Sequence, residues 1–288
     1  GEISCSNLDI IDLTGIEYFT SLTDLSCYSN QLTSIDLGNN IALTELRCHS
    51  NQLTNLDVSQ NTTLIYLYCS NNQLTSLDVS QNTTLNNLWC FGNQLTSLDL
   101  SNNSALNSLT CSTNQLTTLI VNGANAITNL WCENNQLTNL DFSQNTALIW
   151  LHCHNNQLTS LDVSQNTALL EFKCDNNLLT CLNFSNGNNS FLLDINFCAF
   201  NNPSLTCIEV DDYAYSTANW TQIDSQTSFS EDCNNDCSNT SSLTELTTSK
   251  NLIQILDLMG RDTSFKPNTP LIYVYDDGST EKVFSVEY

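Results

Sequence analysis

A strict 21-residue period constrains this chain more than any other feature of its sequence. Cysteine, asparagine and threonine each recur at that interval through eight consecutive copies of one unit. The cysteines are Cys27, Cys48, Cys69, Cys90, Cys111, Cys132, Cys153 and Cys174. Side chains that repeat in register fill the same structural position in successive copies. The period therefore predicts a solenoid with one supersecondary unit per turn.

The unit reads LxxLxCxxNQLTxLDxSxNxx, as in Leu64–Thr84, and it continues from Leu22 to about Asn177. It resembles the leucine-rich repeat pattern LxxLxLxxN/CxL, with cysteine in the third apolar slot. The resemblance implies a right-handed coil with one short parallel strand per turn and a continuous core. The spacing of Leu53 and Val58 suggests a second extended segment on the opposite side. Because no stretch shows a helical period, we expect an all-β solenoid with parallel strands on its concave side.

The repeated cysteines fit buried, unpaired thiols. Alternation along the strand points Leu67 and Cys69 inward together, and a free thiol is a small apolar group. Strands about 4.8 Å apart hold neighbouring Cβ atoms farther apart than the ~3.8 Å of a usual disulfide. We therefore expect free thiols here rather than disulfides or metal ligands. The repeated asparagine is expected to bond backbone groups of its own turn.

A column of aspartates faces outward on the same period. It consists of Asp36, Asp57, Asp78, Asp99, Asp141 and Asp162, and it is interrupted by Ile120 and Asn183. The column is either a solvated face or a row of weak calcium contacts. Because each turn offers a single carboxylate, the solvated face is favoured.

Both ends of the array depart from the period. Residues 1–20 are predicted to be part of an N-terminal cap, and residues 21–202 to be the repeats. Cys198 falls 24 residues after Cys174, so its register is open. Residues 203–237 are predicted to form a C-terminal cap with Trp220 packed over the last turn.

Four cysteines lie in or near the predicted C-terminal cap. We favour a disulfide between Cys207 and Cys233, and we keep Cys181 and Cys237 as alternative partners. The sequence does not choose among these pairings.

The last 50 or so residues have a different composition. Residues 238–242 are rich in Asn, Ser and Thr and are predicted to be a linker. Residues 243–288 contain four of the six basic residues and alternate like short β-strands, with a tight turn at Asp277-Gly278. On ILDLMGR at Ile255–Arg261 and KPNTPLIYVYDDGSTEKV at Lys266–Val283, this module resembles the C-terminal sorting domain of the Bacteroidetes type IX secretion system. The resemblance implies export by that machinery across the outer membrane. The alternative is a small β module of another role.

Composition excludes several classes of partner. The chain has 30 acidic and 6 basic residues and a net charge of −24, which disfavours nucleic acid and anionic membranes. No stretch approaches the roughly 20 apolar residues of a transmembrane segment. The chain starts abruptly at Gly1, which we interpret as a mature or truncated product of a secreted or outer-surface protein.

The outward positions of the short strands are predicted to line the concave surface in three columns. All three histidines, three of the four tryptophans and both basic residues before position 250 fall in these columns. Exposed aromatic residues are enriched where surfaces bind partners. The predicted binding residues are Arg47, His49, Tyr66, Tyr68, Trp89, Phe91, Trp131, Glu133, Trp150, His152, His154 and Lys173.

Metal binding and catalysis are the alternatives to simple binding on this face. A zinc site could use His152 and His154 with Glu133 and Asp175, but charge pairing of His154 with those acidic neighbours is the simpler interpretation. The sequence contains no glycine-rich phosphate loop, no HExxH and no GxSxG. We therefore predict no metal, no cofactor and no enzymatic activity.

The prediction is a recognition or adhesion protein that binds an extracellular protein or polysaccharide through its concave face. One alternative is a passive structural surface protein without a specific ligand. Another is an ice-binding solenoid that uses the threonine and asparagine ladders, although the non-planar outer curve of such repeats counts against it.

Overall fold

The computed structural model describes residues 1–234, 237, 252–257, 270–275 and 280–284. Contacts divide the chain into two compact units, Gly1–Asn239 and Thr240–Tyr288, which are described separately. The predicted linker at residues 238–242 lies outside the described residues, and so do parts of residues 243–288.

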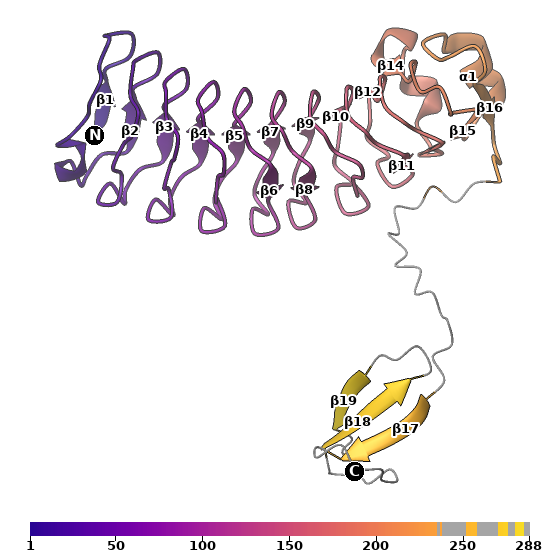
Figure 1. Cartoon of the computed structure of the whole chain (residues 1–288). Coiled ribbons are helices and arrows are strands. Elements are labelled where there is room, and N and C mark those ends of the chain that lie inside the picture. Colours follow the sequence, from indigo (N-terminus) through magenta and orange to yellow (C-terminus); the bar gives the residue numbers. More distant parts are fainter. Residues whose placement is uncertain (235–236, 238–251, 258–269, 276–279, 285–288) are drawn as a thin grey trace. The chain divides into compact units, whose positions relative to one another are not determined.

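The first unit is a parallel β-solenoid whose turns stack into one ten-stranded sheet (Figure 1). Each three-residue strand pairs in parallel with its equivalent one turn later, as Leu67 pairs with Leu88. The strands are, in spatial order, β1 (Glu2–Ser4), β2 (Asp24–Ser26), β3 (Glu45–Arg47), β4 (Tyr66–Tyr68), β5 (Asn87–Trp89), β7 (Ser108–Thr110), β9 (Asn129–Trp131), β10 (Trp150–His152), β12 (Glu171–Lys173) and β14 (Phe197–Cys198). The predicted leucine-rich-repeat solenoid with parallel strands is confirmed.

A second set of extended segments lies on the other side of the coil, below the main sheet in Figure 1. Strands β6 (Ser97–Asp99) and β8 (Thr118–Ile120) form one parallel pair. A four-stranded parallel sheet contains β11 (Ser160–Asp162), β13 (Cys181–Phe184), β15 (Cys207–Val210) and β16 (Ser228–Ser230). The second extended segment expected from the sequence is therefore a strand in these turns.

Leucine and cysteine fill the interior between turns. Leu67 and Cys69 are fully buried, and the eight periodic cysteines are free, as expected. Burial raises the pKa of the Cys69 thiol to about 12, so the thiol stays protonated. Cys5 extends this ladder by one position, because its backbone N–H donates to the Ser26 carbonyl as that of Cys27 donates to the next turn.

The periodic asparagines do more than the sequence analysis predicted. The Asn72 side-chain amide donates to the carbonyl of Cys69 in its own turn and to that of Cys48 in the preceding turn, each at 3.1 Å. Its Oδ1 accepts from the Leu53 backbone N–H at 3.0 Å. Because buried backbone groups need partners, each asparagine ties two turns together as well as closing its own.

A second asparagine ladder was not anticipated from the sequence. The Asn82 side-chain amide donates to the carbonyls of Val58 and Asn61 in the preceding turn, at 3.0 and 2.8 Å. Asn103 repeats these contacts one turn later, and Ala124 interrupts the series. The asparagine near the end of each repeat unit is thus buried and joins that turn to the preceding one.

The N-terminal residues form a turn of the coil. Residues 1–20, expected to belong to a cap, contribute β1, whose residues pair in parallel with β2. A single 3₁₀ turn, η1 (Ile16–Tyr18), follows. The first turn escaped the sequence analysis because Cys27 lies 22 residues after Cys5 and the intervening letters depart from the repeat.

The C-terminal end of this unit carries an aromatic plug. Trp220 is 2% exposed, its ring stacks on Phe197 at 4.2 Å, and its Nε1 donates to the Leu192 carbonyl at 3.0 Å. The preceding α1 (Tyr213–Asn219) is capped by Asp212 and departs from the all-β expectation. A helix of seven residues completes only two turns, which is too short to show a helical period in the sequence.

Two disulfides attach the end of the unit to the second set of strands. Cys207 of β15 is joined to Cys233, and Cys181 of β13 is joined to Cys237. The first pair is the one favoured from the sequence, and the two alternative partners are joined to each other. Cys198 lies outside the thiol ladder, because its register partner is Lys173.

The second unit contains an antiparallel three-stranded sheet. Its strands are β17 (Leu252–Asp257), β18 (Pro270–Tyr275) and β19 (Thr280–Phe284), with β18 in the centre. The predicted Asp277-Gly278 turn and Arg261 lie outside the described residues.

Candidate binding site

The outward side chains of the ten-stranded sheet, with the outward residue two positions beyond each strand, form what we call the strand face. All twelve predicted binding residues lie on it. The parallel register aligns them in columns, because Tyr68, Trp89 and Thr110 pair in succession along β4, β5 and β7. Backbone hydrogen bonds continue the register past the strand ends, as when Asn71 donates to the Phe91 carbonyl at 2.8 Å.

An aromatic cluster occupies the strand face over β3 to β5. The rings of Tyr66 and Tyr68 lie nearly parallel with centroids 6.4 Å apart, and the edge of Trp89 meets Tyr68 at 4.7 Å. The Arg47 guanidinium sits 5.8 Å from the Tyr68 ring centroid and pairs with Glu45 at 2.5 Å. Trp89 is nevertheless 42% exposed, so this cluster presents a large apolar surface to solvent.

His49 lies at the same end of the strand face, but it contacts Tyr28 rather than the aromatic cluster over β3 to β5. Its ring stacks on Tyr28 at 4.5 Å with an interplanar angle of 7°. Burial, and secondarily the charge of Arg47, lower the pKa of His49, so the ring is neutral at pH 7. Its Nδ1 atom is buried without a hydrogen-bond partner.

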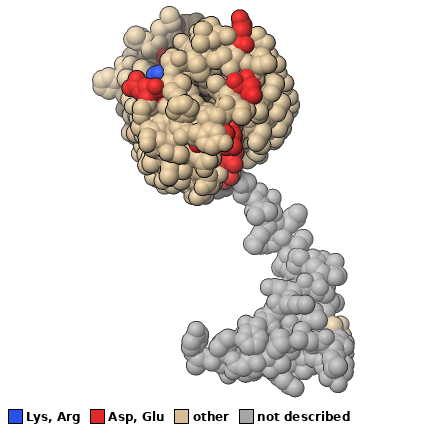
Figure 2. Space-filling view, turned by 90° about the vertical axis from the view of Figure 1, so that its left-hand side faces the viewer, with Lys and Arg blue, Asp and Glu red and all other residues tan. Residues whose placement is uncertain are grey.

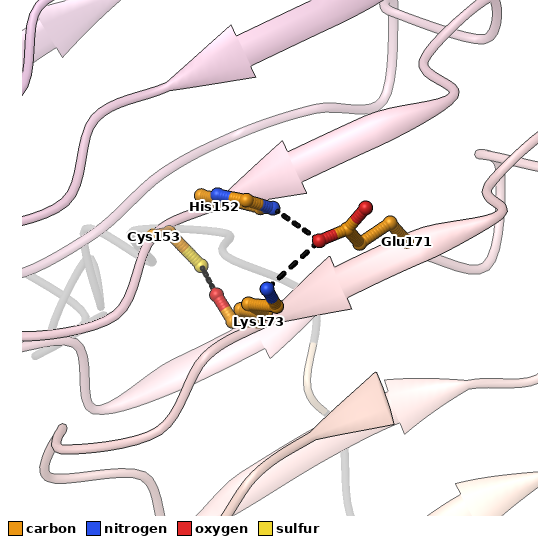
Figure 3. Close-up of polar contacts among 4 residues, drawn as sticks. All are labelled: His152, Cys153, Glu171 and Lys173. Atoms are coloured by element: carbon orange, nitrogen blue, oxygen red, sulfur yellow. Dashed lines mark hydrogen bonds and ion pairs between the residues drawn. The ribbon is translucent and has the colours of Figure 1, made fainter. Parts of the chain in front are cut away.

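A second cluster lies over β9, β10 and β12. The Trp131 ring is 6.3 Å from Trp150 and meets the edge of His152 at 6.1 Å. His152 Nε2 and Lys173 Nζ both contact Glu171 Oε1, at 2.9 and 2.8 Å (Figure 3). Glu171 is not among the residues predicted from the sequence, since only the fold shows that it holds two predicted binding residues.

The ionisation of this cluster follows from its burial. Burial lowers the pKa of His152, and the hydrogen bond to Glu171 opposes this only in part. Burial would raise the pKa of Glu171, but the bonds from Lys173 and His152 outweigh it and lower that pKa. At neutral pH the arrangement is therefore a carboxylate held between an ammonium group and a neutral imidazole.

The predicted charge pairing of His154 is absent. His154 Nδ1 is buried without a hydrogen-bond partner, and so is Glu133 Oε2. Asp175 instead accepts from the side-chain amide of Asn176, its neighbour in sequence. Register therefore places Glu133 and His154 side by side without a hydrogen bond that joins them.

A band of small hydroxyl residues separates the two clusters. β7 and the residue two beyond it present Ser108, Thr110 and Ser112, and the two serines are each 7% exposed. Among the described residues, no ring contact crosses this band. The strand face thus has two aromatic surfaces with small hydroxyl side chains between them.

The outward aspartates have a structural task. Asp57 Oδ1 accepts from the backbone N–H of Ser59 at 2.9 Å, and the other column members bond in the same way. This bond closes a turn and lowers the pKa of Asp57.

Seen from the β1 end, acidic groups are dispersed over a surface that is mostly uncharged (Figure 2). Within the described residues, no group of three His, Cys, Asp or Glu side chains is arranged to hold a metal ion.

Of the helices that the structure describes, none is long and apolar enough to cross a lipid bilayer.

Comparison with known proteins supports the fold. No protein-family model and no curated protein matches the sequence. The functional domain of InlJ from Listeria monocytogenes, described as including a cysteine ladder, is 31% identical over 79% of this chain and 62% of its own length, with a TM-score of 0.43.

Two further solved structures share the leucine-rich-repeat architecture. A leucine-rich repeat protein of Leptospira interrogans is 20% identical over 72% of this chain and 60% of its own, with a TM-score of 0.51. The ectodomain of the Arabidopsis thaliana receptor kinase GASSHO1/SCHENGEN3, in complex with CASPARIAN STRIP INTEGRITY FACTOR 2, is 22% identical over 72% and 26%, with a TM-score of 0.59. The chain spans less than two thirds of each of these three structures. The fold is that of a leucine-rich repeat solenoid.

Proposed function

We propose that this leucine-rich repeat solenoid is an extracellular recognition protein that binds a protein or a polysaccharide through its strand face. One observation carries the proposal: in residues 22–177, where the 21-residue unit recurs, the exposed aromatic side chains all lie on that face. Trp89, Trp150 and Tyr66 are 42%, 41% and 37% exposed there, in turns whose other outward positions are mostly Asn, Gln, Thr, Ser and Asp. Exposed aromatic clusters on a soluble protein are characteristic of binding surfaces.

Two disulfides support a location outside the cell. Disulfides persist in oxidising compartments, and those at Cys181 and Cys207 fasten the end of the solenoid. The proposed role is adhesion to another cell or to a polymer surface, without catalysis. The GASSHO1/SCHENGEN3 ectodomain, which has the same fold, was solved in complex with CASPARIAN STRIP INTEGRITY FACTOR 2, and this supports a protein ligand as one of the two options.

We further propose that residues 243–288 are a type IX sorting domain that follows a linker at residues 238–242. The sequence motifs at Ile255–Arg261 and Lys266–Val283 support this assignment. Fusing residues 238–288 to a periplasmic reporter in a bacterium that has this secretion system tests it directly. Surface display of the reporter is expected, and retention in the periplasm would contradict the assignment.

The binding proposal is tested with the full chain and a Trp89→Ala/Trp131→Ala/Trp150→Ala variant. Both are applied to a glycan array and to a pull-down of cell-surface proteins. Capture by the wild type and at least tenfold weaker capture by the variant are expected, because interface aromatics dominate binding energy.

A matched control removes aromatic surface elsewhere. Tyr18, Phe191 and Tyr213 are 81%, 69% and 55% exposed and lie off the strand face. Their triple alanine variant is expected to retain capture. Equal capture by wild type and tryptophan variant, or no capture by either, would leave a passive structural surface protein as the better interpretation.

A further inference from the structure

The chain contains two Asn-Gly pairs, Asn122-Gly123 and Asn186-Gly187. Asparagine is chemically labile, because the backbone nitrogen of the next residue can attack its side-chain amide carbon. Glycine permits this attack most readily, since it has no side chain to hinder the approach and its backbone adopts many conformations. Both pairs share this chemistry, so the surrounding structure decides which of them reacts.

The pair Asn186-Gly187 is held by hydrogen bonds. The Asn186 side chain is 2% exposed, its amide donates to the Asn166 carbonyl at 3.2 Å, and its Oδ1 accepts from the Asn188 backbone N–H at 3.1 Å. The Gly187 N–H, whose nitrogen would have to attack, donates to Asp211 Oδ2 at 2.6 Å. Reaction at this pair therefore requires these bonds to break first.

The pair Asn122-Gly123 is much less constrained. Asn122 is exposed, and its amide donates to Asp141 Oδ2 at 3.2 Å on the surface. Within the described part of the chain, the Gly123 N–H donates no hydrogen bond. Gly123 has a φ of +107°, and a Cβ added there would meet the Ser101 carbonyl oxygen at 2.1 Å. The fold thus requires glycine beside this asparagine and leaves the attacking nitrogen free.

The segment 120–124 also lacks two side-chain contacts that hold the equivalent segment in other turns. Ile120 stands in the aspartate column and cannot close the turn as Asp57 does. Ala124 stands in the second asparagine ladder and cannot join its turn to the preceding one as Asn103 does. This segment is therefore expected to open more easily than its equivalents.

We infer that Asn122 is a site of spontaneous covalent modification, at which the folded chain converts an amide into a carboxylate. The Gly123 nitrogen loses its proton and bonds to Asn122 Cγ, the Cγ–Nδ2 bond breaks, and ammonia leaves with that proton. Water then opens the cyclic imide. Its addition at Cγ gives aspartate, and its addition at the main-chain carbonyl carbon gives isoaspartate, in which the backbone runs through the side chain. Water is the co-reactant.

The product differs from the original chain in charge and in contacts. The hydrogen bond from Asn122 to Asp141 is replaced by two carboxylates that repel each other. The residues after β8 lie on the side of the coil opposite the strand face (Figure 1). The inference therefore goes beyond the proposed function, and its failure would leave that function untouched.

The test incubates the full chain at mildly alkaline pH, which favours loss of the glycine N–H proton, and follows both pairs by peptide mass spectrometry. Each conversion exchanges NH2 for OH and adds a negative charge, so the converted chain also separates on anion exchange. Conversion at Asn122 is expected to be at least about tenfold faster than at Asn186, because the second pair must first open. In the control, the chain is reduced and unfolded in urea, and the two pairs are expected to react at similar rates.

Two substitutions restore the contacts that the segment 120–124 lacks. Ile120→Asp supplies the carboxylate that closes the turn, and Ala124→Asn supplies the buried amide. The double variant is expected to slow conversion at Asn122 about tenfold and to leave Asn186 unchanged, because the restored bonds must break before the segment opens. Ser76→Ala, an exposed change in another turn, is the control and is expected to alter neither rate.

Unfolding curves show whether each variant folds, and the comparison of the two pairs in the unaltered chain does not depend on them. Absence of conversion at Asn122 in the folded chain, or equal rates at the two pairs while the chain is folded, would overturn the inference. So would an unchanged rate at Asn122 in a folded double variant.

Discussion

The aspartate column and the strand face are both exposed to solvent, yet one is nearly invariant from turn to turn and the other changes at every turn. Exposure alone cannot explain this difference. Asp57 is repeated because its carboxylate closes a turn by accepting from the Ser59 backbone N–H, and its equivalents do the same. The outward strand positions make no such bond that every turn requires. Their composition is therefore free to serve a ligand.

The buried asparagine and cysteine ladders show the same relation between repetition and structural need. Asn72 satisfies backbone groups of two turns, and Cys69 fills a fixed space against the turns on either side. A residue that the coil needs at every turn repeats, and a residue that it does not need varies. The variable surface with exposed tryptophan, tyrosine and histidine is consequently where function is expected.

The largest expected effect is on the asparagine ladder. Asn72→Ala removes four side-chain hydrogen bonds and leaves buried backbone groups unpaired, so the free energy of unfolding is expected to fall by about 3 kcal/mol. Chemical denaturation followed by circular dichroism measures it. The neighbouring exposed Gln73→Ala is expected to change stability by less than about 0.5 kcal/mol. Similar losses in both variants would break the link between repetition and structural need.

A smaller effect is expected in the thiol ladder. Cys90 is fully buried, and Cys90→Ala is expected to cost about 1 kcal/mol by leaving a small cavity. Cys90→Ser is expected to cost more, because its hydroxyl needs a partner that the apolar interior lacks. Cys5→Ala, at the half-buried end of the ladder, serves as the comparison and should lose less. A serine variant as stable as the wild type would contradict this account of the interior.

The smallest effect concerns the aspartate column and depends on pH. The backbone N–H of Ser59, and then its side chain, lower the folded-state pKa of Asp57 below 3.8. A group whose pKa is lowered on folding stabilises the fold above its unfolded pKa, and the benefit is lost as pH falls through the folded value.

Asp57→Asn separates the turn bond from the charge. Asn183 already accepts from the Ser185 backbone N–H at 3.0 Å, so asparagine can close the same turn. The unfolding midpoints of wild type and Asp57→Asn are expected to converge as the pH falls through the lowered pKa of Asp57, with the wild type more stable at pH 7. An unchanged difference between the two proteins from pH 7 to pH 2 would contradict the assigned role of the carboxylate.

The period made most of the fold predictable. Fixed spacing places Leu67 and Cys69 inside and Tyr66 and Tyr68 outside, and the register of the sheet then aligns the columns. The first turn and α1 were missed because neither carries the repeat or a full helical pattern. Contacts between turns were missed as well, since a unit read alone does not show that Asn72 reaches the Cys48 carbonyl.

The sequence predicted which face carries the candidate site residues. It did not predict which of those side chains contact one another. Register places Glu133 beside His154 but leaves them unbonded, whereas His152 reaches Glu171 in a different column. Contacts between columns depend on side-chain rotamers and burial, which the spacing of residues in the sequence does not specify. The sequence thus indicates which surface to test, and the structure indicates which atoms of it lack partners.

The most direct test of the central claim replaces the strand-face residues by the neutral pattern that β7 already shows. A variant with serine or threonine at Tyr66, Tyr68, Trp89, Trp131, Trp150 and His152 keeps every ladder residue. Its unfolding curve and its capture of the ligand are measured beside the wild type. We predict a cooperative fold and loss of capture. Retained capture would show that the variable face is not the binding surface and would contradict the account.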